Sequence, residues 1–369
     1  MEISVHVPEL TKALSRVQGI VEKKSAMPAL SHALITTHGD RISVVATDLE
    51  VALHAEYPAQ VLREGAVCLT AKPLYDIVRS LPGQELVLRE TGHGKVELSC
   101  GKVSYRVHAL STDSFPSVIS SDAVEFSDIP PGTVREMIEK TLYAVSTDDT
   151  RYNLTGVYCE AMPEAPGLRM VSTDGHRLSL VERPTESAPA LPEGVIIPRK
   201  GLHELRKLIE DRGDEAKLGF YESFVAFEVG GVRLTMRLID GRFPDYRQVI
   251  PPTSPKTVKL DRQSFVQALR RTSLLGSDTK GQGVKLELSS GRLKLSVNNP
   301  DLGDAEEELD VGYDGDPLTI GFNCRYLLES LAVLEPDEVH LGLTDELAPG
   351  VITAPGDEGF KAVIMPMRI

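Results

Sequence analysis

The segment Val171-Ser172-Thr173-Asp174-Gly175-His176-Arg177-Leu178 brings a carboxyl, an imidazole and hydroxyl groups close together in the chain. Residues of these types perform general acid–base or nucleophilic catalysis when their geometry is right. An Asp two residues before a His, however, cannot easily orient the imidazole through its second ring nitrogen. The sequence also contains no G-x-S-x-G, P-loop or H-E-x-x-H motif. We therefore expect no catalytic residue, no metal and no cofactor, and a hydrolase is disfavoured.

The same segment has relatives elsewhere in the chain. Val45-Ala46-Thr47-Asp48-Leu49-Glu50 repeats its first half 126 residues earlier, and Leu295-Ser296-Val297-Asn298-Asn299-Pro300 is a weaker echo about as far downstream. Phe115-Pro116 recurs in Gly241-Arg242-Phe243-Pro244-Asp245-Tyr246 at an offset of 128. Repetition at a nearly fixed period predicts that the chain is three copies of one unit.

Each copy is expected to hold helices and short strands. Apolar residues at the helical period, such as Leu10, Leu14 and Val17, predict the helices. Alternating runs around turn signals such as His38-Gly39-Asp40 predict the strands. The expected helices cover 9–24, 71–81, 132–143, 198–212, 261–275 and 323–334, and the expected domains cover 1–120, 128–252 and 256–369. These elements predict an α+β fold of three repeated domains.

Length and composition exclude several classes of protein. A chain of 369 residues with 41% apolar residues can bury a core in each of two or three domains. No segment approaches the roughly 18 apolar residues of a membrane span, and the N-terminus lacks the pattern of an export signal. The cysteines Cys68, Cys100, Cys159 and Cys324 are far apart and form no C-x-x-C pair. We expect buried thiols and a cytoplasmic protein without a membrane partner.

Charge is unevenly distributed along the chain. The net charge is −14, which taken alone disfavours a nucleic-acid binder. The six expected helices hold 17 Lys/Arg and 10 Asp/Glu, a net of +7, whereas the remaining residues hold 23 and 44, a net of −21. Basic helices on an acidic body indicate that the helices share a surface facing a polyanion. The alternative is that the helices merely carry solvated Lys and Arg side chains.

The whole chain resembles the bacterial DNA polymerase III beta subunit family, the sliding clamps. The resemblance rests on the threefold repeat and on Met27-Pro28-Ala29-Leu30, Ala46-Thr47-Asp48, Thr173-Asp174-Gly175-His176-Arg177-Leu178, Ile197-Pro198-Arg199-Lys200, Gly241-Arg242-Phe243-Pro244-Asp245-Tyr246 and Val363-Ile364-Met365-Pro366-Met367-Arg368. It implies a head-to-tail homodimer in which six clamp domains close a ring, with helices inside and sheets outside. Such a ring encircles duplex DNA without reading its sequence, slides along it at the nucleoid, and serves as a processivity factor with no catalytic site of its own.

The resemblance also implies site residues. The polymerase III catalytic subunit, the clamp loader, other polymerases and mismatch-repair proteins would bind by short peptides between the second and third domains. The matching pocket positions are Leu154, Thr173, Gly175, His176, Arg177, Leu178, Pro244, Gln248, Val249, Asn323, Tyr326, Gly350, Val363, Ile364, Met365, Pro366, Met367 and Arg368. The positions matching DNA contacts are Lys24, Lys72, Arg151, Tyr152, Arg199 and Lys200, and those matching the subunit interface are Lys102, Tyr105, Leu274, Leu275, Glu306 and Glu308.

Some positions depart from the family pattern or have a simpler interpretation. Gln248 and Asn153 stand where the family often has a basic residue and an aromatic one, which puts those contacts in doubt. Taken alone, His176 is a histidine that satisfies a turn, and Met365-Pro366-Met367 is core packing. A repeat-built protein scaffold that never encircles DNA is the main rival function. Such a scaffold would have no reason to concentrate basic residues on its helices.

Overall fold

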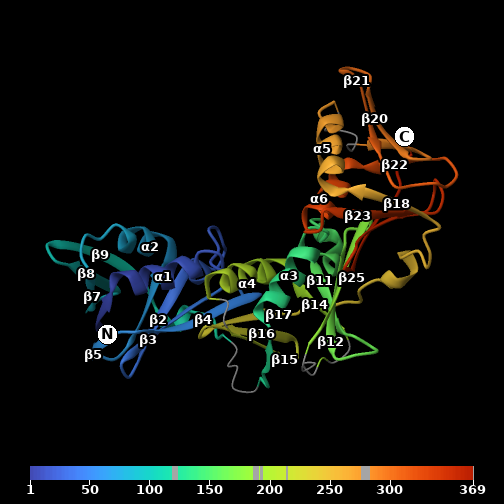
Figure 1. The fold of residues 1–369 in the computed structure, drawn as a ribbon. Coiled ribbons are helices and arrows are strands. Elements are labelled where there is room, and N and C mark those ends of the chain that lie inside the picture. Colours follow the sequence, from blue (N-terminus) through green and yellow to red (C-terminus); the bar gives the residue numbers. More distant parts are fainter. Residues whose placement is uncertain (119–123, 186–190, 192–193, 213–214, 276–282, 369) are drawn as a thin grey trace. The chain divides into compact units, whose positions relative to one another are not determined.

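The computed structural model describes residues 1–118, 124–185, 191, 194–212, 215–275 and 283–368 (Figure 1). Contacts divide the chain into two compact units. Unit 1 comprises Met1–Gly132 with Lys200–Leu238, and unit 2 comprises Thr133–Arg199 with Ile239–Ile369. The middle copy of the repeat therefore contributes one half to each unit. The predicted end of the first domain at residue 120 lies outside the described residues.

Unit 1 is built on a 13-stranded sheet in the order β10-β15-β16-β17-β4-β3-β2-β6-β9-β8-β7-β1-β5. The helices α1 (Val7–Val17), α2 (Ala71–Arg79) and α4 (Arg199–Arg212, of which Arg199 belongs to unit 2) lie along one face of strands β2, β3, β4, β16 and β17 (Figure 1). The strands are β1 (Glu2–His6), β2 (His32–His38), β3 (Arg41–Thr47), β4 (Val51–Pro58), β5 (Gln60–Arg63), β6 (Ala66–Thr70), β7 (Glu85–Gly92), β8 (Lys95–Cys100), β9 (Val103–Leu110), β10 (Ser127–Ile129), β15 (Ala216–Tyr221), β16 (Phe224–Val229) and β17 (Val232–Arg237).

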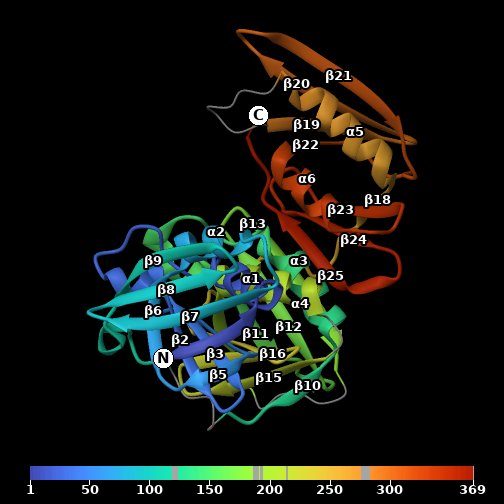
Figure 2. The same ribbon diagram turned by 90° about the vertical axis from the view of Figure 1, so that its left-hand side faces the viewer.

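Unit 2 holds an eight-stranded sheet, β14-β11-β12-β13-β25-β24-β23-β18, and a four-stranded sheet, β21-β20-β19-β22. Its helices are α3 (Pro131–Leu142), α5 (Arg262–Ser273) and α6 (Cys324–Ala332), and α5 lies along strands β19, β20 and β21 (Figure 2). The strands are β11 (Gly156–Ala161), β12 (Gly167–Thr173), β13 (Arg177–Pro184), β14 (Val195–Pro198), β18 (Lys256–Asp261), β19 (Gly283–Ser289), β20 (Arg292–Asn299), β21 (Gly303–Asp310), β22 (Leu318–Asn323), β23 (Glu338–Leu343), β24 (Gly350–Ala354) and β25 (Asp357–Ile364).

The first helix is shorter than predicted. Its apolar face is confirmed, because Leu10, Leu14 and Val17 are fully buried. The helix ends at Val17, however, and not at residue 24, and Gly19 lies two residues later in a turn. Glycine is a poor helix former and commonly marks a helix end. Lys24 therefore lies on a loop.

The other predicted helices are confirmed. Each begins within one residue of its expected start and ends within two residues of its expected end. The six helices as they stand in the structure hold 15 Lys/Arg and 8 Asp/Glu, so their net charge remains +7. None of the described helices has the length and apolar character that crossing a membrane requires.

One turn is built three times along the chain. The side-chain Oδ1 atoms of Asp48, Asp174 and Asn299 each accept hydrogen bonds from the backbone N–H groups two and three residues later, at 2.6–3.2 Å. Such Asx turns satisfy backbone donors at the end of a strand. The residue after the Asp has a left-handed backbone in the first two copies, with φ of 80° at Leu49 and 88° at Gly175. The predicted threefold repeat is thus confirmed at this turn.

Neighbouring copies of the repeat are joined by antiparallel strand pairs. In unit 1, β17 of the middle copy pairs with β4 of the first copy, with Met236 opposite Val51. In unit 2, β25 of the third copy pairs with β13 of the middle copy, with Ile364 opposite Arg177. The middle copy is divided between the two units because each of its halves continues the sheet of a neighbour.

Candidate functional site

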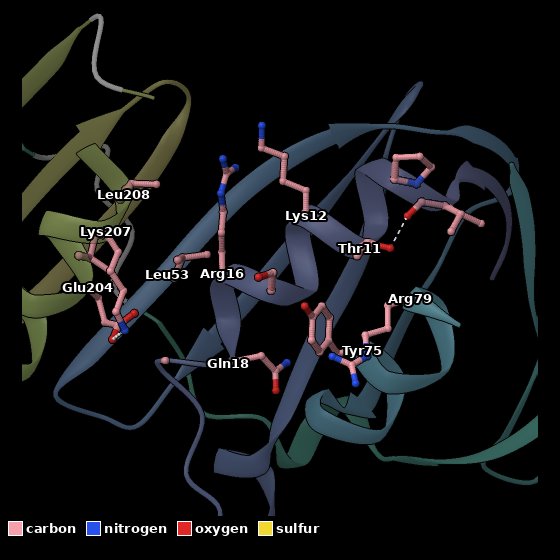
Figure 3. Close-up of a pocket in the computed structure, with 15 residues that line it drawn as sticks. Thr11, Lys12, Arg16, Gln18, Leu53, Tyr75, Arg79, Glu204, Lys207 and Leu208 are labelled. Carbon is pink, nitrogen blue, oxygen red and sulfur yellow. Dashed lines mark hydrogen bonds and ion pairs between the residues drawn. The ribbon is translucent and has the colours of Figure 1, made fainter. Parts of the chain in front are cut away.

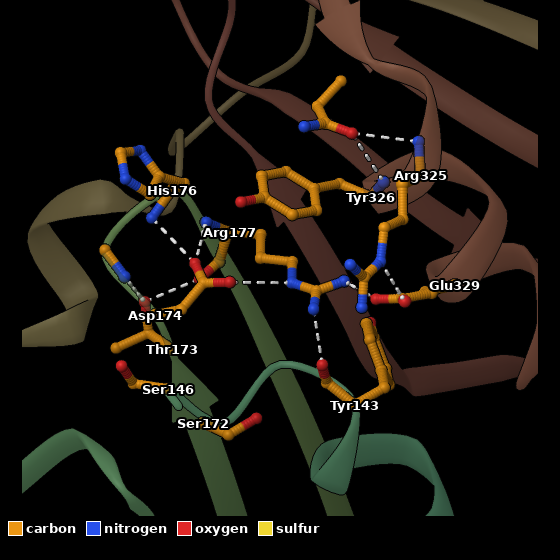
Figure 4. A network of polar contacts seen from close by, with 12 residues as sticks. Tyr143, Ser146, Ser172, Thr173, Asp174, His176, Arg177, Arg325, Tyr326 and Glu329 are labelled. Atoms are coloured by element: carbon orange, nitrogen blue, oxygen red, sulfur yellow. Dashed lines mark hydrogen bonds and ion pairs between the residues drawn. The ribbon is translucent and has the colours of Figure 1, made fainter. Parts of the chain in front are cut away.

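The turn after β12 is a structural turn and not an acid–base pair. The Thr173 hydroxyl donates to the carbonyl of Arg177 at 2.6 Å and accepts from the N–H of Gly175 at 3.0 Å. The carboxylate of Asp174 is occupied by the N–H groups of His176 and Arg177 and by the Arg177 guanidinium (Figure 4). Its carboxylate therefore orients the backbone and Arg177. Within the described ranges, His, Cys, Asp and Glu side chains do not gather in threes as metal ligands.

Arg177 ties this turn to helix α6. Its guanidinium donates to Asp174 at 3.0 Å, to the carbonyl of Tyr143 at 2.6 Å, and to Glu329 of α6, and it stacks 4.4 Å from the centre of the Tyr326 ring (Figure 4). Only 6% of the Arg177 side chain is exposed. Burial acts to raise the pKa of Glu329, but hydrogen bonds from Arg325 and Arg177 hold that pKa below its ordinary value. Removing one partner of such a buried pair leaves an uncompensated charge.

A cavity of about 280 Å³ lies beside the turn. It is lined by Leu154, Thr173, Gly175, Arg177, Leu178, Pro244, Asp245, Tyr246, Val249, Val363 and Met365. All of these except Asp245 and Tyr246 belong to the pocket that the sequence resemblance implies. The structure thus brings together residues that are far apart in the sequence.

Pairing between β13 and β25 fixes two walls of this cavity. Leu178 and Val363 are directly opposite each other in the strand register, and both are buried in one apolar cluster with Leu154 and Tyr246. The backbone N–H of Met365 donates to the carbonyl of His176 at 2.9 Å, which holds the chain after β25 against the turn. About 37% of Met365 remains exposed, so the cavity offers apolar surface to a ligand.

Several other predicted pocket residues do not line the cavity. His176 is exposed, and Ile364 is buried in β25. The Gln248 side-chain amide donates to Asp245 at 2.9 Å. Gln248 therefore stabilises this loop, at a position where the family often has a basic residue. Gly350 lies against the ring of Phe322, where an added Cβ would stand only 2.7 Å from the nearest ring atom.

The remaining predicted pocket residues belong to α6 and the C-terminal segment. Asn323 caps α6 by accepting from the N–H groups of Arg325 and Tyr326. Tyr326 stacks on Arg177. The N–H of Met367 donates to the carbonyl of Gly321 at 2.8 Å, and Pro366 and Arg368 flank it. Tyr326 therefore belongs to the Arg177 network, and none of these residues is among those that line the cavity.

Tyr246 lines the cavity, although the sequence resemblance did not assign it to the pocket. Only 4% of it is exposed, and its hydroxyl donates to Glu160 at 2.5 Å and accepts from Arg169 at 2.9 Å. Arg247 also donates to Glu160, at 2.8 Å, and lies over the Tyr246 ring. We call Glu160, Arg169, Tyr246 and Arg247 the Glu160 clasp. Pro244, Asp245 and Val249 are close in sequence to Tyr246, so the clasp fixes the segment that carries these cavity walls.

Electrostatic interactions keep the Glu160 carboxylate ionised. Burial acts to raise the pKa of Glu160, but hydrogen bonds from Tyr246 and Arg169 outweigh it and hold that pKa below its ordinary value. Burial, helped by the bond to Glu160, raises the pKa of Tyr246. The carboxylate therefore accepts and the phenol donates at neutral pH.

The predicted DNA-contacting residues are spread over several elements. Lys24 and Arg199 are exposed. Lys72 is exposed on α2, 3.0 Å from Asp76. Lys200, in contrast, donates to the Asp48 carboxylate and to the carbonyl of Ile20 at 2.9 Å. Its ammonium is occupied within unit 1, which the sequence alone did not indicate.

Arg151 and Tyr152 lie in the short 3-10 helix Asp149–Leu154. Arg151 donates to Asp148 at 3.0 Å and to the carbonyl of Asp174 at 2.8 Å, so it supports the turn beside the cavity. Tyr152 is 56% exposed.

The predicted interface residues lie on β9, on β21 and after α5. Tyr105 is 38% exposed on β9, and Lys102 is exposed in the turn that precedes it. Leu274 is 78% exposed, and the carbonyl of Leu275 accepts from Asn299 at 2.9 Å. On β21, Glu306 pairs with Lys294 at 2.8 Å and Glu308 with Arg292 at 3.4 Å.

Comparison with known families covers nearly the whole chain. Residues 1–119, 128–245 and 247–368 match the family models for the N-terminal, central and C-terminal domains of the DNA polymerase III beta subunit. The beta sliding clamp of Caulobacter vibrioides (strain NA1000 / CB15N) is 38% identical over 375 residues, and that of Pseudomonas aeruginosa PAO1 is 33% identical over 370 residues. Both alignments cover 100% of each chain.

Solved structures agree with these matches. Caulobacter crescentus pol III beta superposes with a TM-score of 0.95 at 37% identity. The sliding clamp of Bartonella birtlesii bound to griselimycin superposes with a TM-score of 0.94 at 35% identity. Each comparison covers 100% of both chains. The chain therefore belongs to the DNA polymerase III beta subunit family, and it is a sliding clamp, an accessory subunit of the polymerase and not itself an enzyme.

Proposed function

We propose that this clamp works as a head-to-tail dimeric ring that encloses duplex DNA and captures partner proteins by short peptides. The observation that carries the proposal is the repeated junction between copies. β4, β13 and β21 begin 126 residues apart, at Val51, Arg177 and Gly303. β4 and β13 each pair with the last strand of the next copy, whereas β21 is the outer strand of its sheet. We therefore infer that the outer edge of β21 pairs with the equivalent strand of a second chain.

The equivalent strand is β9. The hairpins β8–β9 and β16–β17 both turn through a left-handed glycine, and Val103 and Val232 hold the same first position after the turn. Since Val232 corresponds to Val103, Met236 corresponds to Val107. Along β9, pairing with β6 involves only Ala109 and Leu110 among the described residues. The side of 103–108 that faces away from β8 can therefore accept β21 of another molecule.

The register follows from the two junctions within the chain. Val51 faces Met236 and Arg177 faces Ile364, so Gly303 should face Val107 of the second chain. Asp304 then faces Arg106, and Glu306 faces Ser104. Glu308 comes close to Lys102. Opposite charges at facing positions favour this register, and two such heterologous contacts close a dimer.

We place the domain boundaries at 1–120, 128–252 and 256–369. The family models match nearly the same stretches, 1–119, 128–245 and 247–368. The compact units divide the chain differently because β17 and β13 continue the sheets of the neighbouring domains.

Duplex DNA would occupy the centre of the ring. The six helices carry a net charge of +7 in a chain whose net charge is −14. Lys and Arg contacts to phosphates carry no sequence information and weaken with salt, so they allow sliding. The topology of the closed ring supplies the lasting hold. The exposed side chains of Lys24, Lys72 and Arg199 would contribute phosphate contacts. The protein would act in the cytoplasm at the nucleoid and would need no cofactor.

The cavity beside the Thr173–Arg177 turn would receive the partner peptides. Its walls are mainly aliphatic and include Met365, and each apolar anchor buried there contributes about 1.5–3 kcal/mol. Methionine adapts to different side chains, which suits a site shared by polymerases, the clamp loader and mismatch-repair proteins. Clamps of Bartonella birtlesii and Pseudomonas aeruginosa are known bound to griselimycin. We propose griselimycin as a ligand whose binding to this chain can be tested.

A cysteine pair tests the ring directly. Facing residues have Cβ atoms about 4.5–5.5 Å apart, close to the span of a disulfide. We expect Ser104→Cys/Glu306→Cys to form a covalent dimer of twice 40.2 kDa under mild oxidation. The native cysteines are all buried and do not interfere. Ser104→Cys/Asp310→Cys is the control, because four residues along β21 span about 13 Å. Equal cross-linking of both pairs, or of neither, would contradict the register.

A further inference from the structure

Each copy of the repeat ends its first helix beside its Asx turn. In all three copies, a backbone carbonyl just after this helix accepts a side-chain hydrogen bond. The carbonyls belong to Ile20 after α1, Tyr143 after α3 and Leu275 after α5, and the donors are Lys200, Arg177 and Asn299. The donor is a cation in the first two copies and a neutral amide in the third. The copies therefore satisfy the same carbonyl with side chains of different charge.

In the first copy the cation comes from the next copy. Lys200 is the second residue of α4, and its ammonium bonds both the Asp48 carboxylate and the carbonyl of Ile20, the latter at 2.9 Å. Only 4% of the Asp48 side chain is exposed. Figure 3 shows α4 beside the end of α1, where the Glu204 carboxylate lies against Gly19. A buried ion pair therefore joins the first copy to the second.

A buried ion pair also joins the second copy to the third. The Arg177 guanidinium bonds Glu329 of α6, which belongs to the third copy, and only 6% of the Arg177 side chain is exposed. The same guanidinium bonds the Asp174 carboxylate of its own copy at 3.0 Å. Separating the copies at either junction would leave a buried charge without its partner, which is strongly unfavourable.

The Asx turn of the third copy needs no such cation. The Oδ1 atom of Asn299 accepts from the N–H groups of Asp301 and Leu302 at 2.9 and 3.2 Å. The Nδ2 atom of the same side chain donates to the carbonyl of Leu275 at 2.9 Å. Asn299 is only 7% exposed, and these hydrogen bonds are made within its own chain. One neutral side chain thus combines the roles that a carboxylate and a cation share at the first junction.

Lys72 of the second chain is the cation that would face Asn299 in the proposed dimer. Helices α2 and α4 each begin directly after a strand, and Lys72 and Lys200 are their second residues. Ile77 of α2 is half-buried, whereas its counterpart Leu205 in α4 is fully buried. This face of α2 is thus less covered in the single chain, as expected if a second chain covers it.

We propose that Asn299 makes the contact between the two chains electrically neutral at the position where the junctions within one chain carry a buried ion pair. The inference rests on the proposed dimeric ring and adds to it the residue that distinguishes the junction between chains. A carboxylate at this position would lack a partner in the single chain, whereas the amide is satisfied there by Leu275. The two chains can therefore separate and join again without leaving a buried charge unpaired.

Asn299→Asp tests the inference, because it places a carboxylate where the first junction has Asp48. Lys72 of the second chain can then bond this carboxylate and the carbonyl of Leu275. The readout is the rate at which two fluorescently labelled pools of dimer exchange chains at neutral pH. We expect exchange to slow about tenfold, because a hydrogen bond to a charged group is gained and changes in affinity lie mainly in the dissociation rate.

Substitutions on α2 separate the ion pair from a general effect of charge. Lys72→Gln alone should exchange at the wild-type rate, because Asn299 needs no cation, whereas Asn299→Asp/Lys72→Gln should lose the slowing. Asn299→Asp/Arg79→Gln is the matched control and should stay slow, because Arg79 is the last residue of α2, about 10 Å from Lys72 along the helix. Far-ultraviolet circular dichroism and urea unfolding establish that each variant is folded.

The outcomes separate this inference from the ring on which it rests. If Asn299→Asp exchanges at the wild-type rate or faster, or stays slow without Lys72, the inference is overturned and the dimeric ring stands. If the wild-type chain forms no dimer in which to exchange, the proposed ring itself is overturned. The cysteine pair Ser104→Cys/Glu306→Cys reports that second failure separately.

Discussion

Tyr246 contributes its ring to the cavity wall and its hydroxyl to the Glu160 clasp, so one residue joins the packing of this wall to the clasp that fixes it. Tyr246→Phe removes the hydroxyl and keeps the ring. A hydrogen bond to a charged group contributes about 1.5–3 kcal/mol to stability. We expect the free energy of unfolding to fall by about 1.5 kcal/mol. The loosened wall should weaken binding of a fluorescent peptide with two leucines about fivefold to tenfold, corresponding to about 1–1.4 kcal/mol.

Glu160→Gln should act through the same bond. The effects of Tyr246→Phe and Glu160→Gln on peptide affinity should therefore not add in the double variant. Glu182→Gln is the control, because Glu182 accepts from Arg169 at 2.6 Å without contacting the Tyr246 hydroxyl. Strictly additive effects, or an equal loss of affinity in Glu182→Gln, would show that the clasp does not position the wall.

Glu136 predicts how unit 2 responds to acid. A hydrogen bond from Arg183 is the largest cause that lowers the pKa of Glu136 from 4.5 to about 2, with Lys140 contributing further. A carboxylate with a depressed pKa stabilises the folded state above its unfolded pKa and loses that contribution as pH falls. We expect urea unfolding to give a stability advantage of wild type over Glu136→Gln at pH 7 that shrinks between pH 4.5 and 2. A constant difference across that range would exclude the assignment.

Residue identities alone predicted part of this chemistry. The aliphatic walls could be matched by type, but Tyr246 could not be assigned, because its hydroxyl partners come from β11 and β12, far away in the sequence. Lys200 has the type of a DNA contact, yet Asp48 of another copy takes its ammonium. In both cases the deciding partner is distant along the chain.

In the proposed ring, dimerisation depends on strand β21. Its glutamates and Asp304 are exposed or half-exposed, and the proposed register sets Asp304 opposite Arg106 of the second chain. Asp304→Arg puts two cations face to face, so we expect a shift from dimer to monomer in sedimentation velocity. Asp304→Arg/Arg106→Asp restores opposite charges and should restore the dimer. If the double variant is as monomeric as the single one, the register is wrong.

Turn residues and apolar spacing predicted those helices and strands whose positions depend on local interactions. The hairpin around His38-Gly39-Asp40 is where its turn residues and the alternating runs on either side predicted it. The short strand β5 was not predicted, because its position depends on pairing with β1. The end of α1 was also missed, since apolar residues continue beyond Val17 while Gly19 stops the helix.

The molecule as a whole combines an acidic body with basic helices. A net charge of −14 opposes binding of DNA to most of the surface, while helices with a net charge of +7 attract it. A repeat-built scaffold would need no such separation. Electrostatic contacts alone are lost at high salt, whereas a closed ring is retained on DNA without ends.

Retention on circular and linear DNA is the most direct test of the ring. The chain would be loaded onto a nicked circular plasmid by a bacterial clamp loader, passed through a gel-filtration column at high salt, and then exposed to a restriction enzyme that cuts the plasmid once. We expect the protein to elute with the circle and to leave the DNA within minutes of linearisation. Equal retention on circular and linear DNA, or loss from both at the same rate, would contradict the encircling ring.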